Sequence, residues 1–186
     1  MQNSLIIAGF GGQGVILIGQ LLGYAATAAG MYATYYPAYG AEQRGGTANC
    51  TVVIGDEEIG SPVITKLDTV IVMNEPSLVR FEEWVKPGGT IIINSSLITQ
   101  KPGRTDIQAI YVPTNEIAEK LGSDKIANMV ILGSYLSVSK ALPVEKVIET
   151  MKLKLAAKAK FLPLNEAAIK AGMEAVQERR EISESN

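Results

Sequence analysis

The chain begins with a short apolar segment that ends in clustered glycines, and a long apolar segment follows directly. Residues 5–8 precede a turn made of Gly9, Phe10, Gly11, Gly12, Gln13 and Gly14, and residues 15–29 are almost wholly apolar. A buried strand, a tight turn and a helix in this order open an α/β fold. The unpaired N–H groups at a helix start favour an anion, and glycines let it approach closely. We therefore predict a ligand-binding turn that consists of Gly9, Gly11, Gly12, Gln13 and Gly14.

Three of these glycines, Gly9, Gly11 and Gly14, have the G-x-G-x-x-G spacing of dinucleotide-binding folds. Such a site also needs an acidic residue at the end of the second strand, about 20 residues further on. The second predicted strand, residues 31–35, has no acid, and Glu42 follows only after Pro37. This gap disfavours an ordinary NAD site. Two interpretations stay open: the glycines hold a phosphate, or they only let the helix pack closely against the strand.

Composition excludes several kinds of site. The 186 residues include no histidine and one cysteine, Cys50. The chain therefore lacks the commonest general base and cannot build an iron–sulfur cluster, a structural zinc site or an internal disulfide by itself. We expect Cys50 to be a small buried thiol in a reducing, cytoplasmic setting. A net charge of −2 gives no reason to expect nucleic-acid binding.

The N-terminal segment predicts neither a signal peptide nor a membrane span. It lacks the basic start and cleavage site of a signal peptide, and residues 15–29 are too few to cross a bilayer. Within them Gly19 and Gly23 lie one helical turn apart, which predicts close packing against a neighbouring element. We expect one domain over residues 1–180 and a charged tail over residues 181–186, with fraying from Gln177 onward.

Apolar runs and turn signals predict strands that alternate with helices. The predicted strands are residues 5–8, 31–35, 48–54, 69–73, 90–93 and 107–112. The predicted helices are residues 15–29, 115–121, 128–140, 144–157 and 165–179. One more helix starts at Pro76, carries Val85 on its apolar face and ends at Pro87-Gly88-Gly89, and residues 37–46 are predicted as a loop. This order indicates a single α/β domain with a Rossmann-like, mostly parallel sheet flanked by helices.

Polar residues follow three of the predicted strands. The glycine turn follows residues 5–8, Asn74 follows residues 69–73, and Asn94 closes residues 90–93. Ligands of open α/β sheets bind at the carboxyl ends of the strands, so we expect these segments to share one rim and Asn74 to bind ligand. A cluster of lysines is interpreted as a solvated helix face, with phosphate binding as the alternative. It consists of Lys152, Lys154, Lys158 and Lys160.

A second loop concentrates tyrosines, charges and glycines. The residues of interest are Tyr35, Tyr36, Tyr39, Glu42, Gln43, Arg44, Gly45 and Gly46. Arg44 beside two glycines can present its guanidinium to a phosphate or a carboxylate, and tyrosines are typical interface anchors. The alternative is a stiff structural loop in which Glu42 pairs with Arg44. We favour function, because loops that carry such residues often bind partners or ligands.

Taken together, these motifs resemble those of one known family. The segments 10–14 (Phe-Gly-Gly-Gln-Gly), 39–46 (Tyr-Gly-Ala-Glu-Gln-Arg-Gly-Gly) and 60–62 (Gly-Ser-Pro) occur in this order. They are similar to the gamma subunit of 2-oxoacid:ferredoxin oxidoreductases, over nearly the whole chain. The form of the segments 48–50 and 59–62 is most similar to the 2-oxoglutarate type.

The resemblance implies a subunit of a larger complex that is inert alone. Enzymes of this kind cleave a 2-oxoacid with thiamine diphosphate and Mg, pass single electrons through iron–sulfur clusters to ferredoxin, and transfer the acyl group to coenzyme A. It implies that thiamine diphosphate, Mg and the clusters belong to alpha, beta and delta-type partner subunits. Coenzyme A is the ligand we expect at the complex interface, near the segment 11–14 and Arg44. Isolated, the chain could form a homodimer through its unfilled partner surface.

Three alternatives to this interpretation remain. A subunit of indolepyruvate oxidoreductase has a similar fold and motifs. A stand-alone Rossmann-type protein would bind NAD or another nucleotide by itself. A scaffold module without ligand would tolerate bulky residues in the glycine turn. For Gln13 two roles are equally open, because its amide could bind a ligand or only order the turn.

Overall fold

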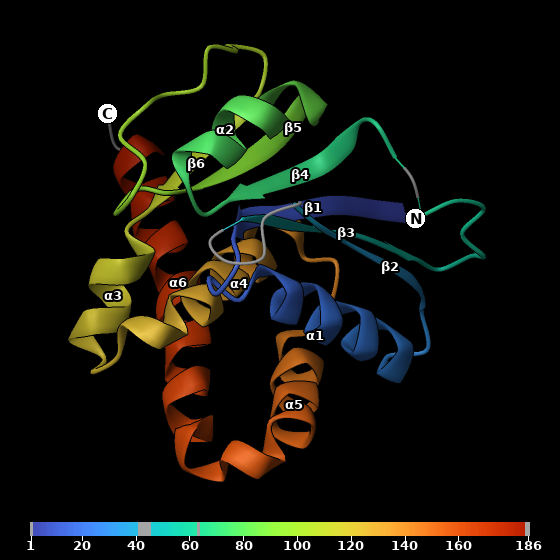
Figure 1. The fold of residues 1–186 in the computed structure, drawn as a ribbon, viewed down its shortest axis with the longest axis vertical. Coiled ribbons are helices and arrows are strands. Elements are labelled where there is room, and N and C mark those ends of the chain that lie inside the picture. Colours follow the sequence, from blue (N-terminus) through green and yellow to red (C-terminus); the bar gives the residue numbers. More distant parts are fainter. Residues whose placement is uncertain (1, 41–45, 63, 185–186) are drawn as a thin grey trace.

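The computed structural model describes residues 2–40, 46–62 and 64–184. In these residues six strands form one sheet in the order β2-β3-β1-β4-β5-β6 (Figure 1). The strands are β1 (Gln2–Phe10), β2 (Tyr32–Tyr39), β3 (Thr47–Gly55), β4 (Leu67–Val72), β5 (Val85–Asn94) and β6 (Gln108–Val112). Strands β1, β4, β5 and β6 run parallel, and β3 is antiparallel to both β1 and β2. The predicted α/β class and the mostly parallel sheet are therefore confirmed.

Helices cover both faces of the sheet in the part of the chain that the structure describes. They are α1 (Val15–Ala28), α2 (Glu75–Phe81), α3 (Thr114–Lys120), α4 (Ala127–Ser139), α5 (Val144–Lys154) and α6 (Leu162–Glu184), with 3-10 turns η1 (Glu82–Trp84), η2 (Asp124–Ile126) and η3 (Ala156–Phe161). Alternate residues of β1 pack into two separate hydrophobic cores. Leu5 and Ile7 join the core formed with α1 and α4, whereas Ile6 and Ala8 join the core under α2. The period-2 alternation of a strand buried on both faces produces this division.

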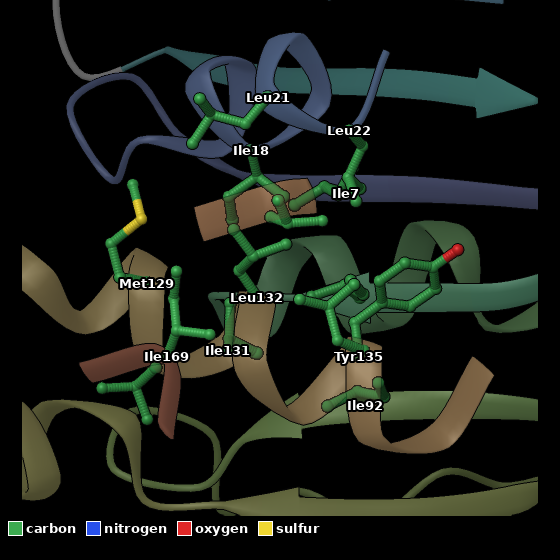
Figure 2. Packing of buried hydrophobic residues seen from close by; sticks show 14 of the residues in the cluster. Ile7, Ile18, Leu21, Leu22, Ile92, Met129, Ile131, Leu132, Tyr135 and Ile169 are labelled. Carbon is green, nitrogen blue, oxygen red and sulfur yellow. The ribbon is translucent and has the colours of Figure 1, made fainter. Parts of the chain in front are cut away.

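The larger core is centred on α4, whose residues from Ala127 to Leu136 are all buried. Figure 2 shows Ile7, Ile18, Leu132 and Ile169 converging there from different elements. At the crossing of α4 and α6, a Cβ on Gly133 would overlap the backbone of Ile169. Only glycine permits this approach of the two helices.

The position of β3 differs from the strand order of a dinucleotide-binding fold, in which the second strand lies beside the first. The second strand, β2, is not beside β1, because antiparallel β3 lies between them. The end of β2 is thus two strands away from the glycine turn. A missing acid there bears less on ligand binding than the sequence comparison implied.

Two predicted boundaries around β2 and β5 were wrong. Residues 37–39, predicted as loop, belong to β2, and Pro37 is paired with Cys50. Proline is tolerated there because β2 is an edge strand, on which a missing N–H costs no pairing. Val85 begins β5 rather than extending the helix, and the pairing to β4 shifts between Leu67 and Thr69, so the segment 86–89 is an irregularity within β5.

The C-terminal helices also differ from the prediction. The helix predicted for residues 144–157 ends at Lys154, and the 3-10 turn η3 follows it. The final helix begins at Leu162 and ends at Glu184, instead of spanning residues 165–179. The division into a domain and a tail at residue 180 remains a prediction. Across the described ranges, no helix combines the length and hydropathy that crossing a bilayer requires.

Candidate site at the glycine turn

The glycine turn joins β1 to α1 through two left-handed residues. Gly12 has φ +99° and Gly14 has φ +75°, values that L side chains rarely adopt. Gly14 is the N-cap of α1, and Ile18 N–H donates the first helical bond, to its carbonyl. The N–H groups of residues 15–17 precede that bond and have no acceptor within the helix. The turn therefore presents the positive end of a helix at the carboxyl end of β1.

Gln13 connects this turn to the neighbouring strand. Its Oε1 accepts a hydrogen bond from the backbone N–H of Phe10 at 2.6 Å, and its Nε2 donates to the carbonyl oxygen of Met73 at 3.1 Å. A Cβ on Gly9 would lie 2.7 Å from Oε1 of Gln13 and 3.0 Å from Cβ of Met73. Gly9 is thus required for the close approach, and Gln13 orders the turn. Whether its second amide N–H also binds a ligand stays a prediction.

The predicted rim is confirmed for all three segments. Met73 N–H donates to the carbonyl of Ala8 at 2.9 Å, which brings the ends of β1 and β4 together. Asn74 lies at this edge and is 3% exposed. Its Oδ1 caps α2 by accepting from Ser77 N–H at 2.9 Å, while its Nδ2 lies 3.4 Å from Oε1 of Gln13. Asn74 therefore has a structural role as a helix cap, and its predicted role in ligand binding remains a prediction.

The next strand end carries a second asparagine network. Asn94, fully buried at the end of β5, donates from Nδ2 to Oδ1 of Asn115 at 2.8 Å and accepts from Ser96 N–H at 3.2 Å. Both side-chain groups of Asn94 thus have partners. We interpret this part of the rim as a scaffold.

Sequence reasoning missed Asn128 as a neighbour of the turn. A Cβ on Gly14 would overlap the carboxamide of Asn128, which lies in the first turn of α4. Asn128 is 7% exposed. The signal available in the sequence was a polar residue at the start of a largely apolar helix, but nothing linked it to Gly14.

Among the described residues, the second loop meets the glycine turn where Gly46 contacts Gly11. Gly11 N–H donates to the carbonyl of Gly46 at 2.8 Å, and Gly40 N–H donates to the carbonyl of Thr47 at 2.6 Å. Tyr36 and Tyr39 are 51% and 71% exposed. The other interface predictions lie outside the described residues, and these are Glu42, Gln43, Arg44 and Gly45.

Cys50 is not part of an exposed redox site. It is fully buried in β3, and a Cβ on Gly19 would overlap its sulfur, which confirms both the buried thiol and the close packing of Gly19. Burial raises the pKa of the Cys50 thiol to about 12. In the described ranges no group of three or more His, Cys, Asp or Glu side chains could hold a metal ion. The described residues fit neither an iron–sulfur cluster nor the metal of thiamine diphosphate.

The structure is a single α/β domain whose glycine turn presents the N-terminal end of a helix. The turn lies at the topological switch point of the sheet, between β1 and β4. Residues 4–175 match the model of the Pyruvate ferredoxin/flavodoxin oxidoreductase family, and the chain belongs to that family. This confirms the family resemblance of the glycine and second-loop motifs.

Known relatives fall into two length classes. Ketoisovalerate oxidoreductase subunit VorA of Methanothermobacter thermautotrophicus is 40% identical over 176 residues, which cover 94% of this chain and 36% of that protein. The chain thus spans about a third of the length of VorA. The 2-oxoglutarate synthase subunit KorC of Methanothermobacter marburgensis is 35% identical over 159 residues, which cover 82% of this chain and 86% of KorC.

Solved structures share the fold. The gamma subunit of a keto/oxoacid ferredoxin oxidoreductase from Geobacter sulfurreducens superposes with a TM-score of 0.82 and 25% identity, over 94% of this chain and 98% of that one. A 2-oxoglutarate:ferredoxin oxidoreductase from Magnetococcus marinus, solved with 2-oxoglutarate, coenzyme A and succinyl-CoA bound, has a TM-score of 0.87 at 22% identity. The superposition includes 95% of this chain and 31% of the chain from Magnetococcus marinus.

Proposed function

We propose that the chain is the gamma subunit of a multi-subunit 2-oxoacid:ferredoxin oxidoreductase. The observation that carries this proposal is the match to KorC, which extends over most of both proteins. The superposition on the Geobacter sulfurreducens gamma subunit, over nearly the whole length of both chains, supports the proposal. The alpha, beta and delta-type subunits would hold thiamine diphosphate, Mg and the iron–sulfur clusters. This chain, with no histidine and one buried cysteine, would be inert alone and act in the cytoplasm.

The proposed substrate is 2-oxoglutarate, which would give succinyl-CoA and CO2. KorC relatives, whose length this chain nearly spans, support that choice. A branched-chain 2-oxoacid is the second candidate, because VorA of Methanothermobacter thermautotrophicus shares 40% identity. Indolepyruvate is the third, since an IorB subunit is 27% identical over 92% of this chain.

Within the complex, the glycine turn is proposed to bind the phosphates of coenzyme A. Residues 15–17 direct unpaired N–H groups of a 14-residue helix toward the rim, and Gly12 leaves open space where a side chain would stand. Arg44 belongs to the loop whose Gly46 is bonded to Gly11, and its guanidinium would add a charged fork for a phosphate. The chain would in this way orient the acyl acceptor without touching the 2-oxoacid.

Partner subunits are proposed to dock on the tyrosine side of the sheet edge. Tyr36 and Tyr39 are more than half exposed on β2, which is the terminal strand of the sheet within the described residues. Large exposed aromatic side chains at a free strand edge are typical of protein interfaces. Isolated from its partners, the chain could form a homodimer through the same surface.

The composition of the native assembly tests the first proposal. The chain would be purified anaerobically from its own cytosol and weighed intact by native mass spectrometry. Co-purifying chains that carry thiamine diphosphate and iron–sulfur clusters are expected. A lone chain or homodimer would contradict the proposal. Reduction of an artificial one-electron acceptor with 2-oxoglutarate, ketoisovalerate or indolepyruvate, each with coenzyme A, then identifies the substrate.

Calorimetry on the assembled complex tests the coenzyme A assignment separately. Arg44→Ala should weaken coenzyme A binding roughly tenfold, as expected for loss of one charged contact. Arg80→Ala, which removes an exposed guanidinium from α2, serves as the matched control. Equal coenzyme A affinity in the Arg44→Ala complex and the control would remove Arg44 from the site while leaving the subunit assignment intact.

A further inference from the structure

A cavity lies among the helices, and Asn128, which lies against Gly14 of the glycine turn, is one of its lining residues. Its volume is about 330 Å³, within the size range of small-molecule sites. Its walls come from α1, η2, α4, the connection between α5 and α6, and the first turn of α6. The lining residues are Leu17, Ser123, Lys125, Ile126, Asn128, Met129, Leu155, Lys158, Phe161 and Asn165.

Two buried carboxamides face this cavity without partners. Asn128 is 7% exposed and Asn165 is 8% exposed. Neither side chain makes a hydrogen bond to any residue that the structure describes, although both line the cavity. Their amide groups are accessible rather than sealed from solvent, because the one fully buried side-chain polar atom without a partner in the described ranges is Oγ1 of Thr34. Two accessible amides on one cavity can donate to and accept from a polar ligand.

The charged side chains that line the cavity are both lysines. Lys125 and Lys158 are exposed at its wall, and no acidic side chain lines it. Two carboxylates adjoin lining residues in the sequence: Asp124, which is exposed beside Lys125, and Glu166, which is engaged by Lys152 at 2.6 Å and Lys170 at 2.8 Å. The cavity therefore favours an anion.

The remaining wall is apolar and includes an aromatic ring. Leu17, Met129 and Leu155 supply aliphatic surface, and the ring of Phe161 is 42% exposed. A planar heterocycle could stack on Phe161, and asparagine carboxamides match the donor and acceptor edge of adenine. Lysines suit the phosphate of the same molecule as point charges.

We propose that this cavity binds a nucleoside phosphate, with the base toward Asn128 and Asn165 and the phosphate toward Lys125 and Lys158. Its phosphate contacts differ from those proposed for coenzyme A at the glycine turn, although Asn128 lies against Gly14. It does not depend on which 2-oxoacid the complex uses.

Binding of ADP to the assembled complex, measured by calorimetry, tests this proposal. Lys125→Ala and Lys158→Ala should each weaken ADP binding roughly tenfold, since each removes one charged contact to phosphate. Lys154→Ala is the matched control, because this exposed lysine lies over the ring of Tyr24 and does not line the cavity. The control should bind ADP within about twofold of the unmodified complex.

Two further measurements distinguish the cavity from other anion sites. Asn165→Leu should abolish the preference for ADP over inorganic phosphate, because it removes an amide from the base side. Saturating coenzyme A should leave ADP binding unchanged. The proposal is overturned by an absence of saturable ADP binding, by full displacement with coenzyme A, or by lysine variants that bind like the control.

Discussion

The side-chain Nε2 of Gln13 donates a hydrogen bond to the carbonyl oxygen of Met73 at 3.1 Å, and this bond joins the turn after β1 to the end of β4. The oxygen of the same amide accepts from Phe10 N–H at 2.6 Å. One glutamine thus fixes both the curvature of the turn and its distance from the next strand. The rim is organised by the chain itself, so a ligand would meet a preformed site.

Replacing Gln13 with leucine should destabilise the chain by about 2 kcal/mol. Leucine keeps a similar volume but leaves the Phe10 N–H and the Met73 carbonyl without their partner. The free energy of unfolding in urea measures this effect. Gln177→Leu, at an exposed position of α6, is the control and should change stability little. Equal stability of both variants would show that Gln13 does not order the turn.

Alanine at Gly14 should cost more stability than alanine at Gly12. Both glycines have positive φ, for which a Cβ costs about 1–2 kcal/mol. At Gly12 nothing lies within 4 Å of the added atom, whereas at Gly14 it would overlap the carboxamide of Asn128. We expect Gly14→Ala to be destabilised by about 2–4 kcal/mol.

A double-mutant cycle separates the collision from the backbone strain. Asn128→Ala removes the overlapping amide, so the double variant should recover about 1 kcal/mol or more relative to additivity. The backbone contribution should persist. Strict additivity of Gly14→Ala and Asn128→Ala would contradict a direct collision between the two residues.

The elements that the sequence predicted well are those whose burial is complete. Residues 5–8, 70–73 and 91–93 are continuous buried apolar runs, as strands covered on both faces require. The strands predicted from them fall in β1, β4 and β5, with Met73 just beyond the end of β4. The glycine turn was equally clear in the sequence, because clustered glycines between two apolar segments indicate a tight turn. Gly12 and Gly14 adopt the positive φ values that such a turn requires.

What the sequence could not predict depends on long-range contacts. The apolar run of residues 48–54 is the same whichever way the strand points, so its antiparallel insertion as β3 carried no local signal. Phe81 and Val85 have helical spacing, yet Val85 pairs with Leu67 in the sheet. Asn128 meets Gly14 only because α4 packs beside the turn. Tertiary packing decided all three outcomes, and at Val85 it overrode a local helical pattern.

Cys50 should be unreactive in the folded chain and should make stability fall at high pH. Its pKa is raised by burial from 9.0 to about 12, so the unfolded state releases its proton first as pH rises. The stabilising contribution is complete below pH 9 and is lost as pH rises toward 12, with a slope that approaches about 1.4 kcal/mol per pH unit. Thiol labelling at pH 8 should require unfolding. Comparison with Cys50→Ala isolates this slope from other titrating groups.

Glu166 should stabilise the α5–α6 region at neutral pH and lose that effect in acid. Hydrogen bonds from Lys152 and then Lys170 lower its carboxyl pKa from 4.5 to about 2. A lowered pKa means that the folded state favours the charged form, so the stabilisation is present above pH 4.5 and disappears as pH falls toward 2. Glu166→Gln should therefore lower the free energy of unfolding at pH 7 but much less at pH 2. Because the pair is partly exposed, high salt should shrink the difference. The control Glu174→Gln alters an exposed carboxylate on the same helix, and a pH dependence as large as that of Glu166→Gln would contradict the assignment.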